Sequence, residues 1–308
     1  MTWRKIKTES PAMRIAALFG LKKLRWSLRR THCPVNRTDL VLEIGAGGNP
    51  YPRANVLLDA EEESVERIEK DLVKDRPLVI GLAEKMPFKD KSFDFIIASH
   101  ILEHSDDPVA FLTELMRVGK AGYIETPEGW FEKMCAFTYH RLEVSEEQGR
   151  LLINKKNSWK PDPISRLYEN KLSSNSDFSH FLRLNPDLNH LRYYWNETIE
   201  FEVLNNEVDC SWDYPEELNG SSLDESEMSF KDKIRQIYLR IRRWILSQNS
   251  RNNSIELISL LRCVDCDSNN ISLLDGLIKC TCCGREYELK NGIPQMMPIN
   301  TKSFHGLR

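Results

Sequence analysis

Between residues 39 and 127, short apolar runs alternate with polar, helix-like stretches, and this rhythm restricts the fold more than any other feature of the chain. Such alternation is typical of a parallel sheet wound with helices. Pro108 to Val118 has apolar residues three and four positions apart, which predicts a helix. The sequence therefore predicts an α/β domain whose strands are residues 40–44, 56–58, 78–80, 93–98 and 123–125.

The first predicted strand ends in Glu43 and runs directly into the turn from Gly45 to Gly47. Glycines there let the backbone approach a ligand that any side chain would hold off. Because Gly-x-Gly turns are also common in ordinary loops, this signal is weak alone. The second strand strengthens it, since it ends in Asp59, from which a carboxylate reaches a ribose diol. Two acids at strand ends indicate a nucleotide-like ligand, because a purely structural sheet has no need of buried charges.

Residues 81–94, 101–108 and 114–118 complete a longer pattern that begins with the glycine turn and Asp59. In this order the elements resemble the class I S-adenosylmethionine-dependent methyltransferases, in the broad group related to ubiquinone-type enzymes. The resemblance covers about residues 39–128 and implies a Rossmann-like sheet, S-adenosylmethionine as cofactor and methyl transfer as activity. It also implies the cofactor contacts: Glu43, Gly45, Ala46 and Gly47 at the methionine end, Asp59 at the ribose, Ala83 and Glu84 beside the adenine, and Ser99 near the sulfonium.

The sequence departs from the family's pattern at two points. Asn49 stands where a third glycine is usual, and the interval to Asp59 is too short for a standard first helix, so we expect a loop there. Leu82 stands where an acid commonly meets the adenine amino group, which leaves that contact open. A degenerate domain that binds no cofactor is therefore an alternative, opposed by the acids at both strand ends.

Methyl transfer, the activity that the resemblance implies, has requirements that single out candidate residues. In-line displacement requires donor and acceptor to be held collinear and dry. A hydroxyl acceptor also needs a general base, whereas an amine or a carboxylate does not. For each candidate, the commoner role is that of a buried, hydrogen-bonded side chain. The candidate bases are His100, His104, Tyr139 and His140.

Four cysteines near the C-terminal end have the spacing of a zinc ribbon. Cys263 and Cys266 form one Cys-x2-Cys pair, and Cys280 and Cys283 form another after thirteen residues. Two such pairs give a closed tetrahedron around one zinc, with no open position, so the metal would be structural. Cys282 leaves the second pair open, although the spacing favours Cys283.

Residues 255–298 look like the small zinc-ribbon activator subunits of tRNA and release-factor methyltransferases. Those subunits bind and stabilise separate methyltransferase chains. Here the ribbon would be fused to its client, which raises its effective concentration. We expect it to dock on the methyltransferase sheet or on that of a neighbouring protomer.

Charge is distributed unevenly along the chain. Residues 1–37 carry ten Lys or Arg side chains and one acid, although the net charge of the chain is −3. The arm's apolar spacing predicts one helix with one apolar face. Such an arm suits an anionic partner such as nucleic acid or a lipid surface, or else the acidic body of the same protein. A second basic helix is predicted at residues 230–246, packed through a stripe of isoleucines, with a membrane surface as the alternative.

These segments divide the chain into parts. No apolar run approaches the roughly 20 residues of a membrane helix, and residues 12–21 are interrupted by Arg14, so we expect neither a transmembrane segment nor a secretory signal. The paired cysteines favour a reducing compartment, and we expect a cytoplasmic protein. The expected parts are a basic helical arm (1–38), a methyltransferase domain (39–212) containing an aromatic-rich, irregular insert (128–195), an acidic linker with the basic helix (213–254) and the ribbon (255–300).

Three functions fit these expectations. The first is methyl transfer to a small or saccharide-like acceptor held under the aromatic insert, because Trp and Tyr faces suit sugar rings. The second is methylation of tRNA or protein, favoured by the basic arm and the ribbon. The third is a non-enzymatic binding protein whose sheet domain has lost its cofactor.

Overall fold

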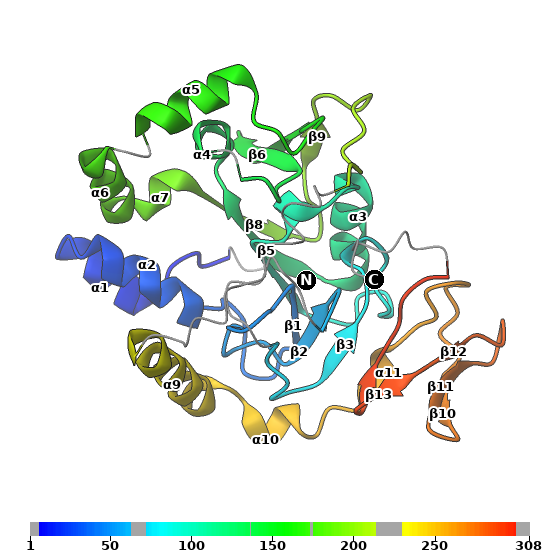
Figure 1. Ribbon diagram of the computed structural model, residues 1–308. Helices are drawn as coiled ribbons and strands as arrows, with labels where there is room; N and C mark the ends of the chain where they lie inside the picture. The colour runs from blue at the N-terminus through cyan, green and yellow to red at the C-terminus, as the bar shows by residue number, and fades with distance from the viewer. Residues whose placement is uncertain (1–5, 63–71, 136, 173–174, 214–229, 300–308) are drawn as a thin grey trace.

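The central layer of the protein is a six-stranded sheet in the order β3-β2-β1-β4-β5-β8, parallel except for β8. Our computed structural model describes residues 6–62, 72–135, 137–172, 175–213 and 230–299 (Figure 1). The five predicted strands are confirmed, and with them the Rossmann-like α/β fold. The strands of this sheet are β1 (Val41–Ile44), β2 (Val56–Asp59), β3 (Leu78–Ile80), β4 (Phe95–Ser99), β5 (Ala121–Pro127) and β8 (His190–Asn196).

The connections of the sheet follow the sequence closely. The predicted helix is α3 (Pro108–Val118), and it begins where the Asp107 carboxylate accepts a hydrogen bond from the Ala110 N–H at 2.9 Å. Its buried face packs on the sheet through Phe111, Leu112 and Leu115. The predicted loop between β1 and β2 is confirmed, since residues 45–55 contain no helix. Short turns of 3-10 helix follow β3 and β4, η2 (Ala83–Lys85) and η3 (Leu102–His104).

The N-terminal arm differs from its prediction. It forms two helices, α1 (Pro11–Leu18) and α2 (Lys22–Leu28), followed by the turn η1 (Arg29–Thr31). Gly20 ends the first helix because it has a φ of +66°, in the left-handed region that favours glycine. The expected apolar face is exposed, with Leu18 at 85% exposure, whereas Met13 and Ala16 are buried. The prediction of a single helix was therefore wrong, and the apolar face that the sequence indicates is exposed.

The aromatic-rich insert is regular rather than irregular, which corrects the sequence prediction. Its strands β6 (Leu142–Glu147) and β7 (Arg150–Lys155) form a hairpin that buries alternate apolar residues, the pattern that a period of two produces. After the hairpin, β8 joins the edge of the main sheet, whereas β9 (Phe201–Val203) pairs with β7. The helices of the insert are α4 (Gly129–Met134), α5 (Pro163–Leu172), α6 (Ser176–Leu184) and α7 (Pro186–Asn189).

The second basic helix, α9 (Phe230–Leu246), has the predicted bounds but a different orientation. Ile234, Ile237 and Ile241 are exposed, so the prediction that the helix packs through this stripe was wrong. Instead, Leu239 and Arg243 are buried, and Arg243 donates a hydrogen bond to the Gly48 carbonyl of the glycine turn. The acidic linker before it lies mostly outside the described residues. Within the described part of the chain, no helix is long and apolar enough to cross a membrane.

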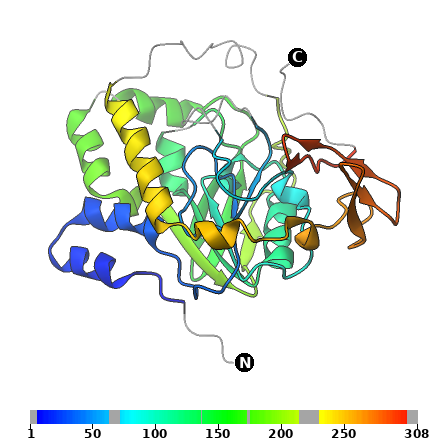
Figure 2. The same ribbon diagram turned by 90° about the horizontal axis from the view of Figure 1, so that it is seen from below.

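The C-terminal part lies beside β3 and is built from short elements (Figures 1 and 2). Asn291 and Gly292 form a hairpin turn with positive φ angles, as their order predicts. The Met296 N–H donates to the Ile80 carbonyl at 2.7 Å, and Met296 is fully buried in the core shared with the sheet. The elements are α10 (Asn249–Asn252), α11 (Leu257–Leu260), β10 (Ile271–Leu274), β11 (Leu277–Cys280), β12 (Glu286–Tyr287), β13 (Leu289–Lys290) and β14 (Ile293–Pro294).

Candidate active site

Three buried carboxylates lie near the carboxyl ends of strands of the parallel sheet. Glu43 lies on β1, Asp59 ends β2 and Glu125 lies on β5. Ligands of open α/β sheets bind outside this edge, where strand order reverses. Sequence reasoning identified Glu43 and Asp59 but missed Glu125. The signal was present, because Glu125 follows an apolar run just as the other two acids do.

The glycine turn is shaped by these acids. Gly45 and Gly47 have φ angles of +64° and +52°. A side chain at Gly45 would come within 2.7 Å of Ile101, so the position also lacks room. The Gly47 N–H donates to the Asp59 carboxylate at 3.2 Å. Ala46 is buried in the core, so the turn presents its backbone rather than side chains to a ligand.

Arginines from two distant segments surround this turn. Arg30, just after the N-terminal helices, donates to the Asn49 carbonyl and lies over the Tyr51 ring at 4.4 Å. Arg242 on α9 donates to the Asn49 side-chain oxygen at 3.0 Å. Arg243 donates to the Gly48 carbonyl at 3.5 Å. The glycine turn therefore has a cationic rim, which suits an anionic group of a ligand.

Glu43 holds the turn from behind. Its carboxylate accepts a hydrogen bond from the Tyr51 N–H at 2.7 Å. Burial raises the pKa of Glu43 to about 7, and the Arg30 charge and the Tyr51 hydrogen bond offset only part of that effect. The side chain is therefore close to its titration point at neutral pH.

Glu125 has the opposite electrostatic environment. Its carboxylate accepts two hydrogen bonds from Arg29, each at 2.7 Å, and one from Tyr123. Burial favours the protonated carboxyl, but the Arg29 and His100 contacts outweigh it and hold the pKa of Glu125 well below its usual range. The arm thus supplies a charged cap for the end of β5.

His100 joins this network directly after β4. Its Nε2 lies 3.1 Å from a Glu125 oxygen and its Nδ1 lies 3.3 Å from a Glu103 oxygen. Burial lowers the pKa of His100, but the two carboxylates prevail and raise it to about 9. A protonated imidazole has no lone pair to accept a proton. Ser99, also expected here, has its hydroxyl 3.5 Å from Glu125.

Two of the three other candidate bases, His104 and His140, lie together. The rings of His104 and His140 are 4.8 Å apart at 83° to one another. The His140 Nδ1 lies 2.6 Å from a carboxylate oxygen of buried Glu132, a residue that sequence reasoning missed. Nothing in the sequence links these positions, because Glu132 and His140 come from the insert and His104 comes from η3.

The expected adenine side is formed by η2. Glu84 is held by the Ser105 hydroxyl, which donates to its carboxylate at 2.5 Å. Burial raises the pKa of Glu84, although the Ser105 hydrogen bond opposes it. Leu82 is buried beside Ala83, so the apolar character that the sequence shows there persists in the fold.

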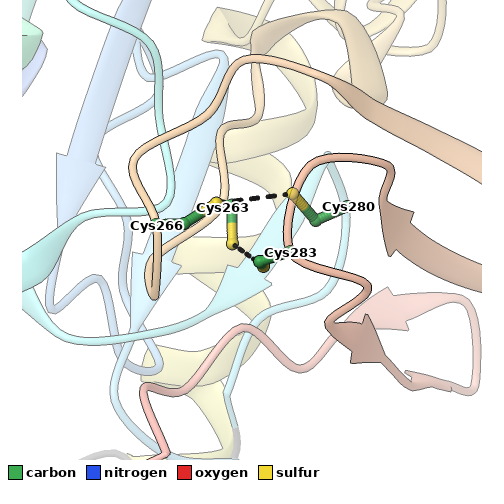
Figure 3. Close-up of side chains that lie close together, drawn as sticks. All are labelled: Cys263, Cys266, Cys280 and Cys283. Atoms are coloured by element: carbon green, nitrogen blue, oxygen red, sulfur yellow. Dashed lines mark hydrogen bonds between the residues drawn. The ribbon is translucent and has the colours of Figure 1, made fainter.

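The structure brings the four predicted cysteines together (Figure 3). Their sulfur atoms lie within 4.8 Å of one another, with 3.6 Å between Cys263 and Cys283 and between Cys266 and Cys280. A tetrahedral zinc with Zn–S bonds of about 2.3 Å needs sulfurs about 3.8 Å apart. The arrangement therefore has the dimensions of a closed zinc site, and Cys282 stands outside it.

Comparisons with known proteins find methyltransferases that are similar to the part of the chain that contains the main sheet. Residues 42–124 match the family described as methyltransferase domain. An uncharacterised methyltransferase of Schizosaccharomyces pombe is 30% identical over 145 residues, which are 40% of this chain and 52% of that protein. The ubiquinone/menaquinone biosynthesis C-methyltransferase UbiE of Stenotrophomonas maltophilia is 30% identical over 103 residues, or 29% of this chain and 40% of that protein. The matches thus span about half or less of these relatives' lengths.

Among solved structures, the complex between the Haloferax volcanii Trm112 methyltransferase activator and a putative methyltransferase is similar, with a TM-score of 0.34 and 17% identity. The match covers 60% of this chain and 93% of that one. The YcgJ protein of Bacillus subtilis gives a TM-score of 0.31 with 18% identity, covering 56% of this chain and 94% of that one.

Proposed function

Because residues 42–124 match the methyltransferase domain family, we propose that the chain transfers a methyl group from S-adenosylmethionine to a small-molecule or saccharide-like acceptor. One observation carries this proposal. The glycine turn meets buried Glu43 and Asp59 at the carboxyl edge of the sheet, beneath a rim of arginines. That combination fits a ligand with a sugar, an amino group and a carboxylate.

Each part of the edge has a role in this proposal. Asp59 would accept hydrogen bonds from the ribose hydroxyls, and Ala83 with Glu84 would border the adenine. Glu43, Gly45, Ala46, Gly47 and Ser99 would line the methionine end, where the rim arginines suit its carboxylate. When bound, S-adenosylmethionine supplies an electrophilic methyl group on a positively charged sulfur.

The chain's own task is positioning and exclusion of water. Arg29 and His100 fix the Glu125 carboxylate, so the wall beside Ser99 is held by charged hydrogen bonds. Trp26, below the Arg29 guanidinium at 3.7 Å, packs against the His190 ring at 4.8 Å. Such fixed surroundings hold donor and acceptor in line, which supplies on the order of 7–11 kcal/mol of rate acceleration.

The arm supports a small acceptor rather than a polymer. Arg25 pairs with Glu9 and Asp187, and Arg29 pairs with Glu125. These arginines are therefore occupied by carboxylates of the protein itself. Lys22 donates to Asn185 at 2.7 Å, which ties α2 to the insert beside the edge of the sheet.

Calorimetry with S-adenosylmethionine tests the proposal. Asp59→Asn should weaken binding at least tenfold, because an amide offers one acceptor oxygen where the ribose needs two. Asp177→Asn, an exposed change on α6, is the matched control and should bind like the wild type. Transfer of labelled methyl groups to fractionated small molecules then identifies the acceptor. Absence of cofactor binding by the wild-type chain would contradict the proposal.

We also propose that Cys263, Cys266, Cys280 and Cys283 hold one structural zinc. The sulfur separations and the lack of an open position support a structural rather than a catalytic ion. Tyr287 supports the same reading, because its hydroxyl lies 3.0 Å from the Cys263 sulfur and would donate to a thiolate. Metal analysis of the purified chain should give one zinc per chain.

A further inference from the structure

Glu103, His104 and His140 form a second cluster of metal-binding groups, outside the zinc ribbon. One ligand atom from each residue lies within 4.8 Å of the other two. Glu103 and His104 are adjacent on η3, whereas His140 comes from the loop between α4 and β6. The sequence interval gives no hint of this meeting, which the fold alone produces.

Glu103 is the key member because one of its two carboxylate oxygens has no hydrogen-bond partner. The side chain is 1% exposed. One oxygen faces the His100 Nδ1 at 3.3 Å, and the other, Oε2, is buried with no hydrogen-bond partner. A buried charged oxygen without a partner costs free energy, so native proteins keep such groups where a ligand or ion satisfies them.

His140 is oriented as metal-binding histidines are. Its Nδ1 lies 2.6 Å from the Glu132 carboxylate, which fixes the ring and directs Nε2 away from that contact. Glu132 is itself held by Lys156 at 2.8 Å and by the Phe137 N–H at 3.1 Å. A carboxylate behind a histidine ligand sets its tautomer and raises its basicity as a ligand.

We propose that Glu103, His104 and His140 bind a divalent first-row metal ion that activates a hydroxyl acceptor. Two imidazoles and one carboxylate suit such an ion, and three protein ligands leave coordination positions open. The inference rests on the proposed methyl transfer and deepens it, since it makes the acceptor atom an oxygen. It also removes the need for a histidine base, because the ion lowers the pKa of the bound hydroxyl.

The step balances without any redox partner. The acceptor hydroxyl loses its proton to solvent as its oxygen binds the ion. A lone pair of that oxygen forms the new O–CH₃ bond while the S–CH₃ bond breaks and its electron pair stays on sulfur. The products are the methyl ether and the neutral thioether S-adenosylhomocysteine. The ion keeps its charge throughout and supplies only electrostatic stabilisation.

Manganese(II) is the probe that separates the two clusters, because thiolate sites prefer zinc whereas a carboxylate ligand suits manganese. The full chain with its ribbon zinc retained is titrated with MnCl₂, and free Mn²⁺ is followed by electron paramagnetic resonance. We expect one bound Mn²⁺ per chain. His140→Ala and Glu103→Gln should each weaken binding more than tenfold, while His180→Ala, an exposed histidine on α6, should leave it unchanged.

The same samples guard against misfolding and separate the two proposals. Retained S-adenosylmethionine binding by His140→Ala shows that the variant is folded. Absence of Mn²⁺ binding by the wild type, or equal binding by wild type and His140→Ala, overturns the metal site even if methyl transfer proceeds. A chain that binds Mn²⁺ but no S-adenosylmethionine overturns the proposed function and leaves the ion site standing.

Discussion

The protein gathers candidate metal ligands in two places that differ in how their charge is balanced. The cysteine cluster consists of four sulfurs on two turns, with Tyr287 near one of them. In the cluster of Glu103, His104 and His140, by contrast, protein groups already hold two members: His100 faces Glu103, and Glu132 faces His140. The first cluster offers four thiol groups and, if it holds the proposed zinc, that ion would balance its charge. The second cluster is a polar network in which one buried carboxylate oxygen, Oε2 of Glu103, has no hydrogen-bond partner.

A candidate metal site is easier to recognise from sequence spacing when its residues lie close together in the sequence. It is harder to recognise when the tertiary fold brings distant residues together. A ribbon is short and local, so its ligands must be close in sequence. The ligands of the second cluster belong to η3 and the insert, and the sheet brings them together.

Loss of one cysteine should unfold the ribbon. Binding of structural zinc supplies roughly 10–16 kcal/mol in small zinc-finger peptides, so Cys263→Ser removes most of what holds this segment. Bound zinc should fall from one per chain to none, and residues 255–298 should become sensitive to protease. Cys282→Ser is the matched control, because Cys282 is outside the cluster. Zinc retained by Cys263→Ser, or lost from Cys282→Ser, would contradict the assignment of ligands.

Glu125 is a buried carboxylate whose charge is balanced by two side chains of the protein, Arg29 and His100, and not by a metal ion. Arg29→Met leaves Glu125 with His100 as its remaining charged partner and should cost about 3–5 kcal/mol of unfolding free energy. Arg25→Met, on the same arm, breaks two more exposed pairs, with Glu9 and Asp187, and should cost less than about 1 kcal/mol. Urea denaturation at pH 7 measures both. Equal losses would show that burial of the Arg29 pair has no special weight.

The sequence predicts the sheet well because its strands are encoded locally. The runs that become β1 to β5 and the cap of α3 at Asp107 need no distant partner to be recognised. The orientation of α9 was not predictable in this way. Its isoleucine stripe indicates packing, yet the helix turns Arg242 and Arg243 toward the glycine turn, where the Asn49 side-chain oxygen and the Gly48 carbonyl accept their hydrogen bonds.

The candidate site divides along the same line. Glu43 and Asp59 were predicted because each follows an apolar strand. Arg29 was counted only as one charge of a basic arm, since its partner Glu125 is almost a hundred residues away in sequence. Long-range pairing of charges depends on tertiary contacts, and no local pattern reports it.

The charges and hydrogen bonds around Glu43 only partly offset the cost of burying its ionised carboxylate. The contribution of Glu43 to stability therefore depends on pH. Its pKa is about 7 in the folded chain and 4.5 as a free side chain, so folding favours the protonated form. Its contribution to stability is therefore complete below pH 4.5 and disappears as pH rises through 7. Glu43→Gln lacks this dependence. Between pH 5 and pH 8 the variant should gain up to about 3 kcal/mol relative to the wild type, measured by urea denaturation without cofactor. Parallel pH profiles would show that Glu43 is already charge-balanced.

The smallest effect tests whether the second cluster is a metal site or only a network. Glu132→Gln keeps a hydrogen-bond acceptor for His140 but removes the charge behind it. Loss of such a supporting carboxylate weakens metal binding by about 10- to 100-fold, so Mn²⁺ affinity should fall by that factor. Glu143→Gln is the matched control, because Glu143 bonds Asn154 in the same hairpin and does not belong to the cluster. If the two variants bind Mn²⁺ equally, Glu132 only stabilises the insert through its contact with Lys156. The unpartnered oxygen of Glu103 is then the one remaining feature that distinguishes the second cluster from an ordinary polar network.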